Sequence, residues 1–269
     1  QTCALPISNA EELIDKVDVV DIVSSTVSHY HCAQKALRNS KHVFIEKPIA
    51  HSLEEARNII NLSNEANVKI QVGHAERFNP AFIAAKDVIN QPLFLDSQRI
   101  VEFSESSIDT SVVLDLMIYD IDIILNIVKS SIKKISATGV NIINGNPDIV
   151  NARIEFDNGC VANLTASRLG TDNVKKTLIY QKDASISIDF LNEKTQILNV
   201  DGCNKEKVIN LRKPITSSVD TIEKELLSFS DSILNDTIPQ VTADDGFNAL
   251  SVAHIILDKL KDSPHLINY

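Results

Sequence analysis

The chain has 269 residues, of which 43% are hydrophobic and 23% charged, a composition typical of a folded globular protein. Its formal net charge is −10, and no basic cluster offsets that charge, which argues against nucleic acid or an anionic membrane as the main partner. No apolar run approaches the roughly 20 residues of a membrane-spanning helix.

Residues 8–78 are predicted to alternate between helices and strands. The predicted helices cover 8–17, 28–41 and 52–68, and the predicted strands cover 18–25, 42–48 and 69–78. Ser28 is the expected N-cap of the second helix. Strands separated by helices of this length indicate βαβ units, and therefore a parallel sheet.

The pattern changes after about residue 92. A strand at 94–103 and an apolar helix at 111–128 are followed by β-type runs at 132–143, 148–157, 159–169, 175–181, 184–190 and 195–200. Successive strands without intervening helices favour an antiparallel sheet, and Asp157-Asn158-Gly159 predicts a hairpin between two of them. Helices at 217–235 and 243–260 are expected to close the chain.

The cysteines and glycines restrict the chemistry. Cys3, Cys32, Cys160 and Cys203 are far apart and form no C-x-x-C motif, so we expect free thiols in a reducing cytoplasm. No His, Cys or carboxylate residues group at metal-ligand spacing, and no metal is expected. None of the seven glycines is followed by another two positions later, so the sequence holds neither a G-x-G-x-x-G motif nor a P-loop.

Polar residues follow each of the three predicted parallel strands, at the end of the sheet where ligands of such folds bind. They are Ser24 and Ser25, the Glu46-Lys47-Pro48 triplet, and Gly73 with His74. Lys47 is the leading candidate for an acid or base, with Glu46 orienting it. A surface turn with a solvated charge pair explains the spacing equally well.

Asp115 and Tyr119 are spaced i, i+4 and share one face of the apolar helix. Because polar residues on a buried helix need partners or a function, the pair could polarise a substrate hydroxyl. Core packing of Tyr119, with Asp115 bonded to backbone, is the alternative that spacing alone favours. Asp120 and Asp122 point elsewhere and are interpreted as structural.

Arg77 could bind a substrate phosphate or carboxylate, although an exposed loop arginine is the commoner explanation. Arg99 is a second candidate for the same role, and Asn79 lies beside Arg77 in the sequence. His29 could approach a ligand from the start of the second helix.

Four segments together resemble the Gfo/Idh/MocA oxidoreductases. They are "VDIVSSTVSHYHCAQKALRNSKHVFIEKPIAHSLEEA", "VGHAERFNPAF", "VVLDLMIYDIDIIL" and "VTADDGFNALSVAHIIL". Within the family, the chain is most similar to the UDP-N-acetylglucosamine 3-dehydrogenase-like branch, which acts on nucleotide-activated sugars. The resemblance runs from about residue 9 to the end.

The resemblance implies an α/β fold in two parts. Residues 8–90 would form the C-terminal half of a dinucleotide-binding Rossmann domain with a parallel sheet. Residues 91–269 would form an α+β substrate and oligomerisation domain with an open, mainly antiparallel sheet. The implied reaction is hydride transfer between NAD or NADP and a sugar hydroxyl carbon, and homo-oligomers would form through the sheet face.

The resemblance also assigns roles to residues. Lys47 matches the lysine that contacts nicotinamide and substrate, and Asp115 matches the aspartate that holds the reacting hydroxyl. The expected cofactor-binding set is Ser24, Ser25, His29, Glu46, Lys47, Pro48 and His74, and the expected substrate-binding set is Arg77, Asn79 and Arg99.

Tyr119 departs from the family, which usually has the acid/base histidine at that position. A phenol loses its proton near pH 10, whereas histidine does so near pH 6.5. Lys47 could lower the pKa of Tyr119, or take over the proton transfer itself. If neither holds, the protein is a catalytically silent homologue that binds a ligand or oligomerises.

The family's opening half, with its glycine-rich turn, has no counterpart in the sequence. "QTCALPI" at residues 1–7 is the in-frame translation of a common sequencing adapter (CAG ACG TGT GCT CTT CCG ATC). We therefore expect residues 1–7 to be non-native and the gene product to be longer. Because such glycines anchor the pyrophosphate at a helix N-terminus, we expect this 269-residue chain to bind NAD weakly or not at all.

Overall fold

The computed structural model describes residues 10–104, 110–143, 146–201, 208–214 and 220–261. The chain divides into two compact units. The first unit comprises the residues up to His74 together with Glu223–Leu250, and the second comprises Ala75–Ile222 and the residues from Ser251 onward. Residues 1–7, expected to be non-native, lie outside the described residues.

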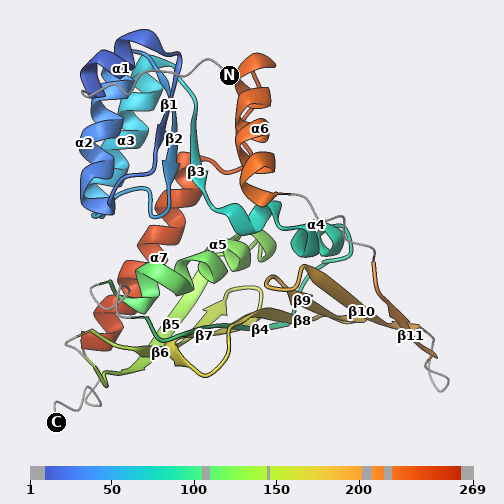
Figure 1. Ribbon diagram of the computed structural model, residues 1–269. Coiled ribbons are helices and arrows are strands. Elements are labelled where there is room, and N and C mark those ends of the chain that lie inside the picture. The colour runs from blue at the N-terminus through green and yellow to red at the C-terminus, as the bar shows by residue number, and fades with distance from the viewer. Residues whose placement is uncertain (1–9, 105–109, 144–145, 202–207, 215–219, 262–269) are drawn as a thin grey trace. The chain divides into compact units, whose positions relative to one another are not determined.

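The first unit contains a three-stranded parallel sheet with strand order β1-β2-β3 and helices packed against it (Figure 1). Its elements are α1 (Ala10–Lys16), β1 (Val19–Ile22), α2 (Thr26–Arg38), β2 (His42–Glu46), α3 (Leu53–Ala66), β3 (Ile70–Gly73), α6 (Thr221–Leu234) and the start of α7 (Ala243–Lys261). The predicted alternation of strands and helices, and the predicted parallel sheet, are confirmed.

The central strand β2 is buried on both faces, as its continuous apolar run predicts. Val43 and Ile45 are fully buried, and Phe44 packs against Phe229 of α6 with ring centroids 6.1 Å apart. Gln71 of β3 donates a hydrogen bond from Nε2 to the carbonyl of Glu225, also on α6, at 3.0 Å. These contacts place α6 in the first unit, although its position in the sequence suggested the second.

The ends of two elements differ from the sequence prediction. Helix α2 begins at Thr26 with Ser25 as N-cap, one turn before the predicted cap Ser28. Strand β3 ends at Gly73, and the 3-10 turn η1 (Ala75–Phe78) replaces the rest of the predicted strand. Helix α3 begins with a capping box between Ser52 and Glu55. In this motif each of the two side chains accepts a hydrogen bond from the backbone N–H of the other residue.

The second unit is built on an eight-stranded sheet with strand order β11-β10-β9-β8-β4-β7-β6-β5. Its elements are η1, α4 (Pro80–Lys86), β4 (Phe94–Glu102), the π-helical turn η3 (Val113–Met117), α5 (Ile118–Ile127), β5 (Ile132–Val140), β6 (Ile149–Phe156), β7 (Val161–Gly170), β8 (Val174–Tyr180), β9 (Ala184–Asp189), β10 (Lys194–Asp201), β11 (Val208–Arg212) and the rest of α7. The mainly antiparallel sheet is confirmed. One pair, β4 with β7, is parallel.

Helices α4 and α5 cover one face of this sheet (Figure 1). Alternate residues of the strands face them and are buried, among them Leu95, Ile154, Leu164 and Ile179. Thr195 of β10 fixes α4 by donating a hydrogen bond to the Ala81 carbonyl at 2.6 Å. Because α4 packs on this sheet, the unit boundary lies near residue 74, whereas the sequence suggested residue 90.

The predicted hairpin between β6 and β7 is present. Gly159 has φ +86°, a conformation that glycine adopts without strain, and its N–H donates to the Phe156 carbonyl at 3.0 Å. In the described part of the chain, no helix combines the length and the hydropathy needed to cross a bilayer.

Candidate functional site

In the first unit, the polar clusters follow the carboxyl ends of three adjacent parallel strands. Ser24 and Ser25 follow β1, Lys47 and Pro48 follow β2, and His74 follows β3. This is the edge at which ligands bind in such sheets. The cofactor-binding residues predicted from the sequence therefore share one edge.

Glu46 and Gly73 are paired across the β2–β3 edge. A Cβ at position 73 would lie 2.8 Å from Glu46 Oε2 and 3.1 Å from Glu46 Cα, so a larger residue there would displace the Glu46 side chain and crowd the backbone of β2. Burial raises the pKa of the Glu46 carboxyl above its ordinary value; a hydrogen bond from the Lys47 backbone N–H opposes the rise, and the charge of Asp21 adds to it. Glu46 thus holds its proton more readily than an exposed glutamate.

Lys47 is half-buried and is joined to Pro48 by a cis peptide bond. The side chains of Ser24 and Ser25 are exposed at the same edge. Ser25 makes no side-chain cap to α2, although its hydroxyl lies 3.3 Å from that of Ser28. Serine hydroxyls can donate or accept hydrogen bonds and an ammonium group can donate them; binding of the nicotinamide end of a dinucleotide at this edge stays a prediction.

In the second unit, Asp115 and Tyr119 lie where the π turn η3 continues into α5. The N–H of Ile118 bonds the carbonyl of Val113, five residues earlier. Asp115 and Tyr119 are both half-buried, unlike the fully buried Met117 and Ile118 between them. Such π turns occur often at functional sites.

Tyr119 stacks on a buried guanidinium group. The Arg99 side chain, 1% exposed, lies with Cζ 4.8 Å from the centroid of the Tyr119 ring. Arg99 donates two hydrogen bonds of 3.0 Å to the Asp120 carboxylate and one of 2.8 Å to Glu76. Burial opposes ionisation, but the charges of Asp120 and Glu76 outweigh it and raise the pKa of Arg99. A permanent cation therefore faces Tyr119 within its own unit.

Arg77 and Asn79 also have internal partners. Arg77 is 4% exposed and donates hydrogen bonds of 2.7 Å and 2.6 Å to the two carboxylate oxygens of Asp122. The alternative of an exposed loop arginine is wrong, and the structural interpretation of Asp120 and Asp122 is confirmed. Asn79 caps α4 by accepting from the Ala81 N–H, and its amide donates to Glu76 and to the Phe190 carbonyl.

These partners matter for the predicted substrate contacts. A substrate anion at Arg77 or Arg99 would have to compete with carboxylates that already hold the guanidinium groups. Sequence reasoning missed Glu76 as a partner of Arg99, because the two residues are 23 positions apart and no local pattern joins them. Substrate binding by Arg77, Asn79 and Arg99 stays a prediction.

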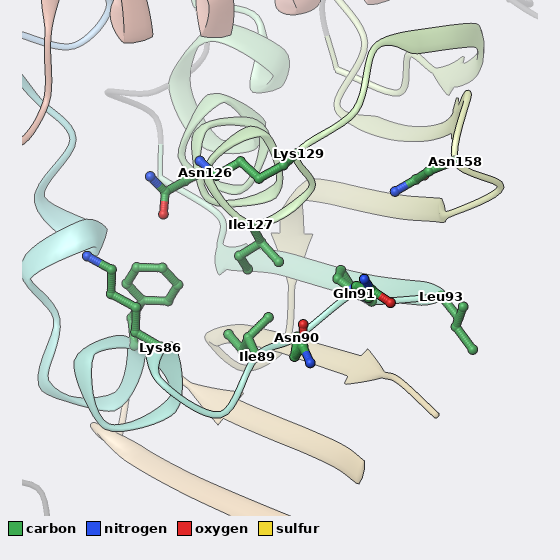
Figure 2. Close-up of a pocket in the computed structure, with 11 residues that line it drawn as sticks. Lys86, Ile89, Asn90, Gln91, Leu93, Asn126, Ile127, Lys129 and Asn158 are labelled. Carbon is green, nitrogen blue, oxygen red and sulfur yellow. The ribbon is translucent and has the colours of Figure 1, made fainter. Parts of the chain in front are cut away.

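A pocket of about 870 Å³ lies in the second unit, at the C-terminal ends of α4 and α5. Figure 2 shows Lys86, Asn126 and Lys129 on one side of it, with Asn158 of the hairpin on the other. None of the described residues that line it is acidic. Both lysines follow the general preference of cations for helix C-termini, so their position requires no ligand. Asp115 and Tyr119 lie at the opposite end of α5.

The placement and burial of the described residues also bear on metal binding and on the reactivity of the thiols. Within the described ranges, no group of three or more His, Cys, Asp or Glu side chains could hold a metal ion. Cys32 and Cys160 are free thiols, and burial raises the pKa of Cys160 to about 11. Cys160 is therefore an inert core residue rather than a nucleophile.

Comparison with known proteins identifies the class to which this fold and this sheet edge belong. Residues 2–74 match the family model described as "Oxidoreductase family, NAD-binding Rossmann fold", and residues 91–187 match the "GFO/IDH/MocA C-terminal domain". The chain belongs to the Gfo/Idh/MocA family of oxidoreductases.

One similar relative is UDP-N-acetylglucosamine 3-dehydrogenase of Acidithiobacillus ferrooxidans, 32% identical over 190 residues, or 70% of this chain. A crystal form of that protein superposes with a TM-score of 0.90 at 26% identity, covering 95% of this chain and 83% of that one. scyllo-Inositol 2-dehydrogenase (NAD(+)) of Bacillus subtilis is 31% identical over 169 residues, covering 56% of this chain and 49% of the relative. Levoglucosan dehydrogenase in complex with NADH shares the fold, with a TM-score of 0.85 at 20% identity, covering 95% of this chain and 81% of that one.

The sequence matches span 61% of the Acidithiobacillus protein and 49% of the Bacillus protein. The sequence alignments thus span about half to three-fifths of these relatives' length, and the superposition covers 83% of the Acidithiobacillus chain.

Proposed function

We propose that this protein is an NAD(P)-dependent dehydrogenase that transfers hydride to or from a hydroxyl-bearing sugar carbon. The observation that carries the proposal is Lys47, at the carboxyl end of the central parallel strand, in a chain whose two parts both match oxidoreductase family models. The cofactor, held by the residues of the first-unit edge, would supply the hydride acceptor or donor.

In the oxidation direction the neutral Lys47 amine would accept the proton of the reacting hydroxyl, and in the reduction direction the Lys47 ammonium group would donate that proton to the substrate oxygen. Asp115 would accept a hydrogen bond from that hydroxyl and orient it. These two residues belong to different units, so their joint action is part of the proposal. General acid–base catalysis of this kind typically contributes about 10²- to 10⁴-fold to the rate.

Tyr119 would assist as the proton donor or acceptor at the position of the family histidine. The Arg99 guanidinium against its ring supports this role, because a nearby cation favours the phenolate over the phenol. The carboxylates of Asp120 and Glu76, which hold Arg99, reduce that effect. Arg99 is thus a second candidate, beside Lys47, for the cation on which the acidity of Tyr119 would depend.

The substrate class follows from the named relatives. The Acidithiobacillus protein is a UDP-N-acetylglucosamine 3-dehydrogenase and the Bacillus protein an inositol dehydrogenase, so we propose a nucleotide-activated sugar first and a free cyclic polyol second. We also propose that the protein works in the cytoplasm and forms homo-oligomers through the face of the large sheet that α4 and α5 leave uncovered.

The test is to mix the protein with NAD or NADP and each candidate substrate, and to follow NADH or NADPH absorbance. UDP-N-acetylglucosamine, N-acetylglucosamine and scyllo-inositol separate the nucleotide-sugar, free-sugar and polyol alternatives. Reduction that requires one substrate and is lost in Lys47→Met supports the proposal. NADH binding without turnover of any substrate would instead favour the catalytically silent homologue.

Tyr119 is the specific observation that favours the catalytically silent homologue. Its effect on the rate of hydride transfer can be tested separately. If Tyr119 impairs the site, Tyr119→His should raise the hydride-transfer rate by far more than a few-fold, because imidazole titrates near neutral pH. If Tyr119 is itself the working group, Tyr119→Phe should lower the rate and Tyr119→His should change it little.

A further inference from the structure

The His29 ring is buried, and both of its nitrogens face carbonyl oxygens. The side chain is 1% exposed. Nδ1 lies 2.9 Å from the Pro48 carbonyl oxygen, and Nε2 lies 2.9 Å from the Ser24 carbonyl oxygen. A neutral imidazole has one N–H and one lone pair, so it could donate to only one of them. At the other carbonyl, two lone pairs would face each other.

The ring lies within electrostatic reach of an acidic residue, Glu46. The His29 charge acts on the Glu46 carboxyl, which also feels Asp21 and Lys47. Asp21 and Lys47 act on the same carboxyl with opposite signs. Two hydrogen bonds from a charged donor are the compensation that a buried cation requires.

The two acceptors belong to the two segments that frame the sheet edge. Ser24 lies just after β1, and Pro48 directly follows Lys47. We propose that His29 is a positioning residue that remains doubly protonated near neutral pH and fastens both segments to α2, thereby fixing the main chain at Lys47. Since both nitrogens are used internally, His29 would act through Lys47 rather than by bonding the cofactor. The consequence for catalysis rests on the proposed function, whereas the protonation state does not.

The protonation state is directly measurable. In the ¹⁵N-labelled chain at about neutral pH, long-range ¹H–¹⁵N spectra should show both His29 ring nitrogens at protonated chemical shifts. The signals are assigned by their loss in His29→Gln, and exposed His51 serves as the internal reference for an ordinary ring. One unprotonated His29 nitrogen at that pH would overturn the proposal.

The positioning role has its own readout, which needs neither cofactor nor activity. The acylation rate of Lys47, followed by mass spectrometry across pH, should show a several-fold step where the spectra show His29 losing its second proton. The step should be absent in His29→Gln, because the glutamine side chain does not titrate. Its amide nitrogen can donate to one of the two carbonyls, provided that its own carbonyl oxygen points away. Lys41, half-buried in the same unit, should show no such step in either protein. A Lys47 profile identical in both folded proteins would overturn the positioning role, and a failed dehydrogenase assay would leave these results unaffected.

Discussion

Lys47 holds the position on which the proposed chemistry depends, and its replacement is the first test at the scale of single residues. In Lys47→Met, loss of the ammonium group should lower hydride transfer by about 10²- to 10⁴-fold. The control is Lys41→Met, a half-buried lysine at the opposite end of β2. Reduction of NAD(P) at saturating substrate measures the rate. An unchanged rate in Lys47→Met would remove this residue from the chemistry.

Glu46 leads to a prediction about pH. Its pKa is raised from 4.5 by burial, so the folded protein binds the proton more tightly than the unfolded chain does. The stability that this proton contributes is present below about pH 4.5 and is lost as the pH rises through the higher folded value. Glu46→Gln cannot ionise, and we expect its gain in melting temperature over the wild type to be larger at about pH 7 than at about pH 4.

The control for this experiment is Glu54→Gln, an exposed acid in the first turn of α3. It should show no comparable dependence of the difference on pH. A smaller gain for Glu46→Gln at the higher pH would mean that its hydrogen bond from Lys47, and not its burial, decides the ionisation.

The sequence predicts the place of a single residue when the pattern that indicates it lies in the neighbouring residues. Lys47 could be placed at the sheet edge because a strand pattern runs directly into Glu-Lys-Pro. The partners of Arg77 and Arg99 could not, because ion pairs between a turn, a strand and a helix leave no periodic trace. His29 could be placed at the start of a helix, but its two carbonyl acceptors lie 5 and 19 residues away.

At the scale of elements, α5 is fastened by the buried ion pair of Arg77 with Asp122. In Arg77→Met, the Asp122 carboxylate stays buried without its cation, which should cost about 3–5 kcal/mol of unfolding free energy. Arg153→Met is the matched control, because Arg153 and Glu155 form an exposed pair worth at most about 1 kcal/mol. Urea unfolding followed by circular dichroism measures both. Equal losses would show that the buried pair is not what stabilises this element.

The N-termini of α2 and α3 provide a second comparison between elements. Ser52 accepts a hydrogen bond from the Glu55 N–H, whereas Ser25 makes no side-chain cap. Ser52→Ala should therefore destabilise the protein by about 0.5–2 kcal/mol, while Ser25→Ala should stay within about 0.5 kcal/mol. A large loss in Ser25→Ala would point to a capping bond that forms in solution.

Most elements could be predicted, because hydrophobic periodicity is a local property. The exceptions have physical causes. The predicted strand 69–78 is shortened because Arg77 and Phe78 turn into the core of the second unit. The parallel pairing of β4 with β7 joins segments about 70 residues apart, and strand order at that separation is set by packing rather than by local pattern.

At the scale of the whole molecule, the uncovered face of the eight-stranded sheet is the proposed contact between copies. Tyr180 is 41% exposed there, with its ring centroid 6.0 Å from that of Phe94 on the neighbouring strand. If the face is an interface, Tyr180→Glu should bury a charge and reduce the molar mass measured by light scattering. Leu234→Glu, at an exposed position on α6, is the control and should leave the mass unchanged. A wild-type protein of monomer mass at all concentrations would exclude the interface.

The arrangement of the units was only partly readable from the sequence. The two sheet types follow from the alternating and the consecutive strand patterns. The return of α6 to the first unit does not, because it depends on contact between Phe44 and Phe229, which are 185 positions apart in the sequence. Contacts between segments so far apart in the sequence depend on the complementary shapes of their packed side chains.

The π turn at Val113–Met117 makes the spacing between Asp115 and Tyr119 sensitive to chain length. A π turn holds more residues per turn than an α-helix, so removal of Leu116 would allow the segment to wind as ordinary helix. Each residue of an α-helix advances about 100° around the axis, so Asp115 and the tyrosine, then three positions apart, would differ by about 60° around the axis and by about 4.5 Å along it. Side-chain exchanges along this stretch would leave that geometry unchanged, whereas the deletion of one residue would shift the carboxylate relative to the phenol.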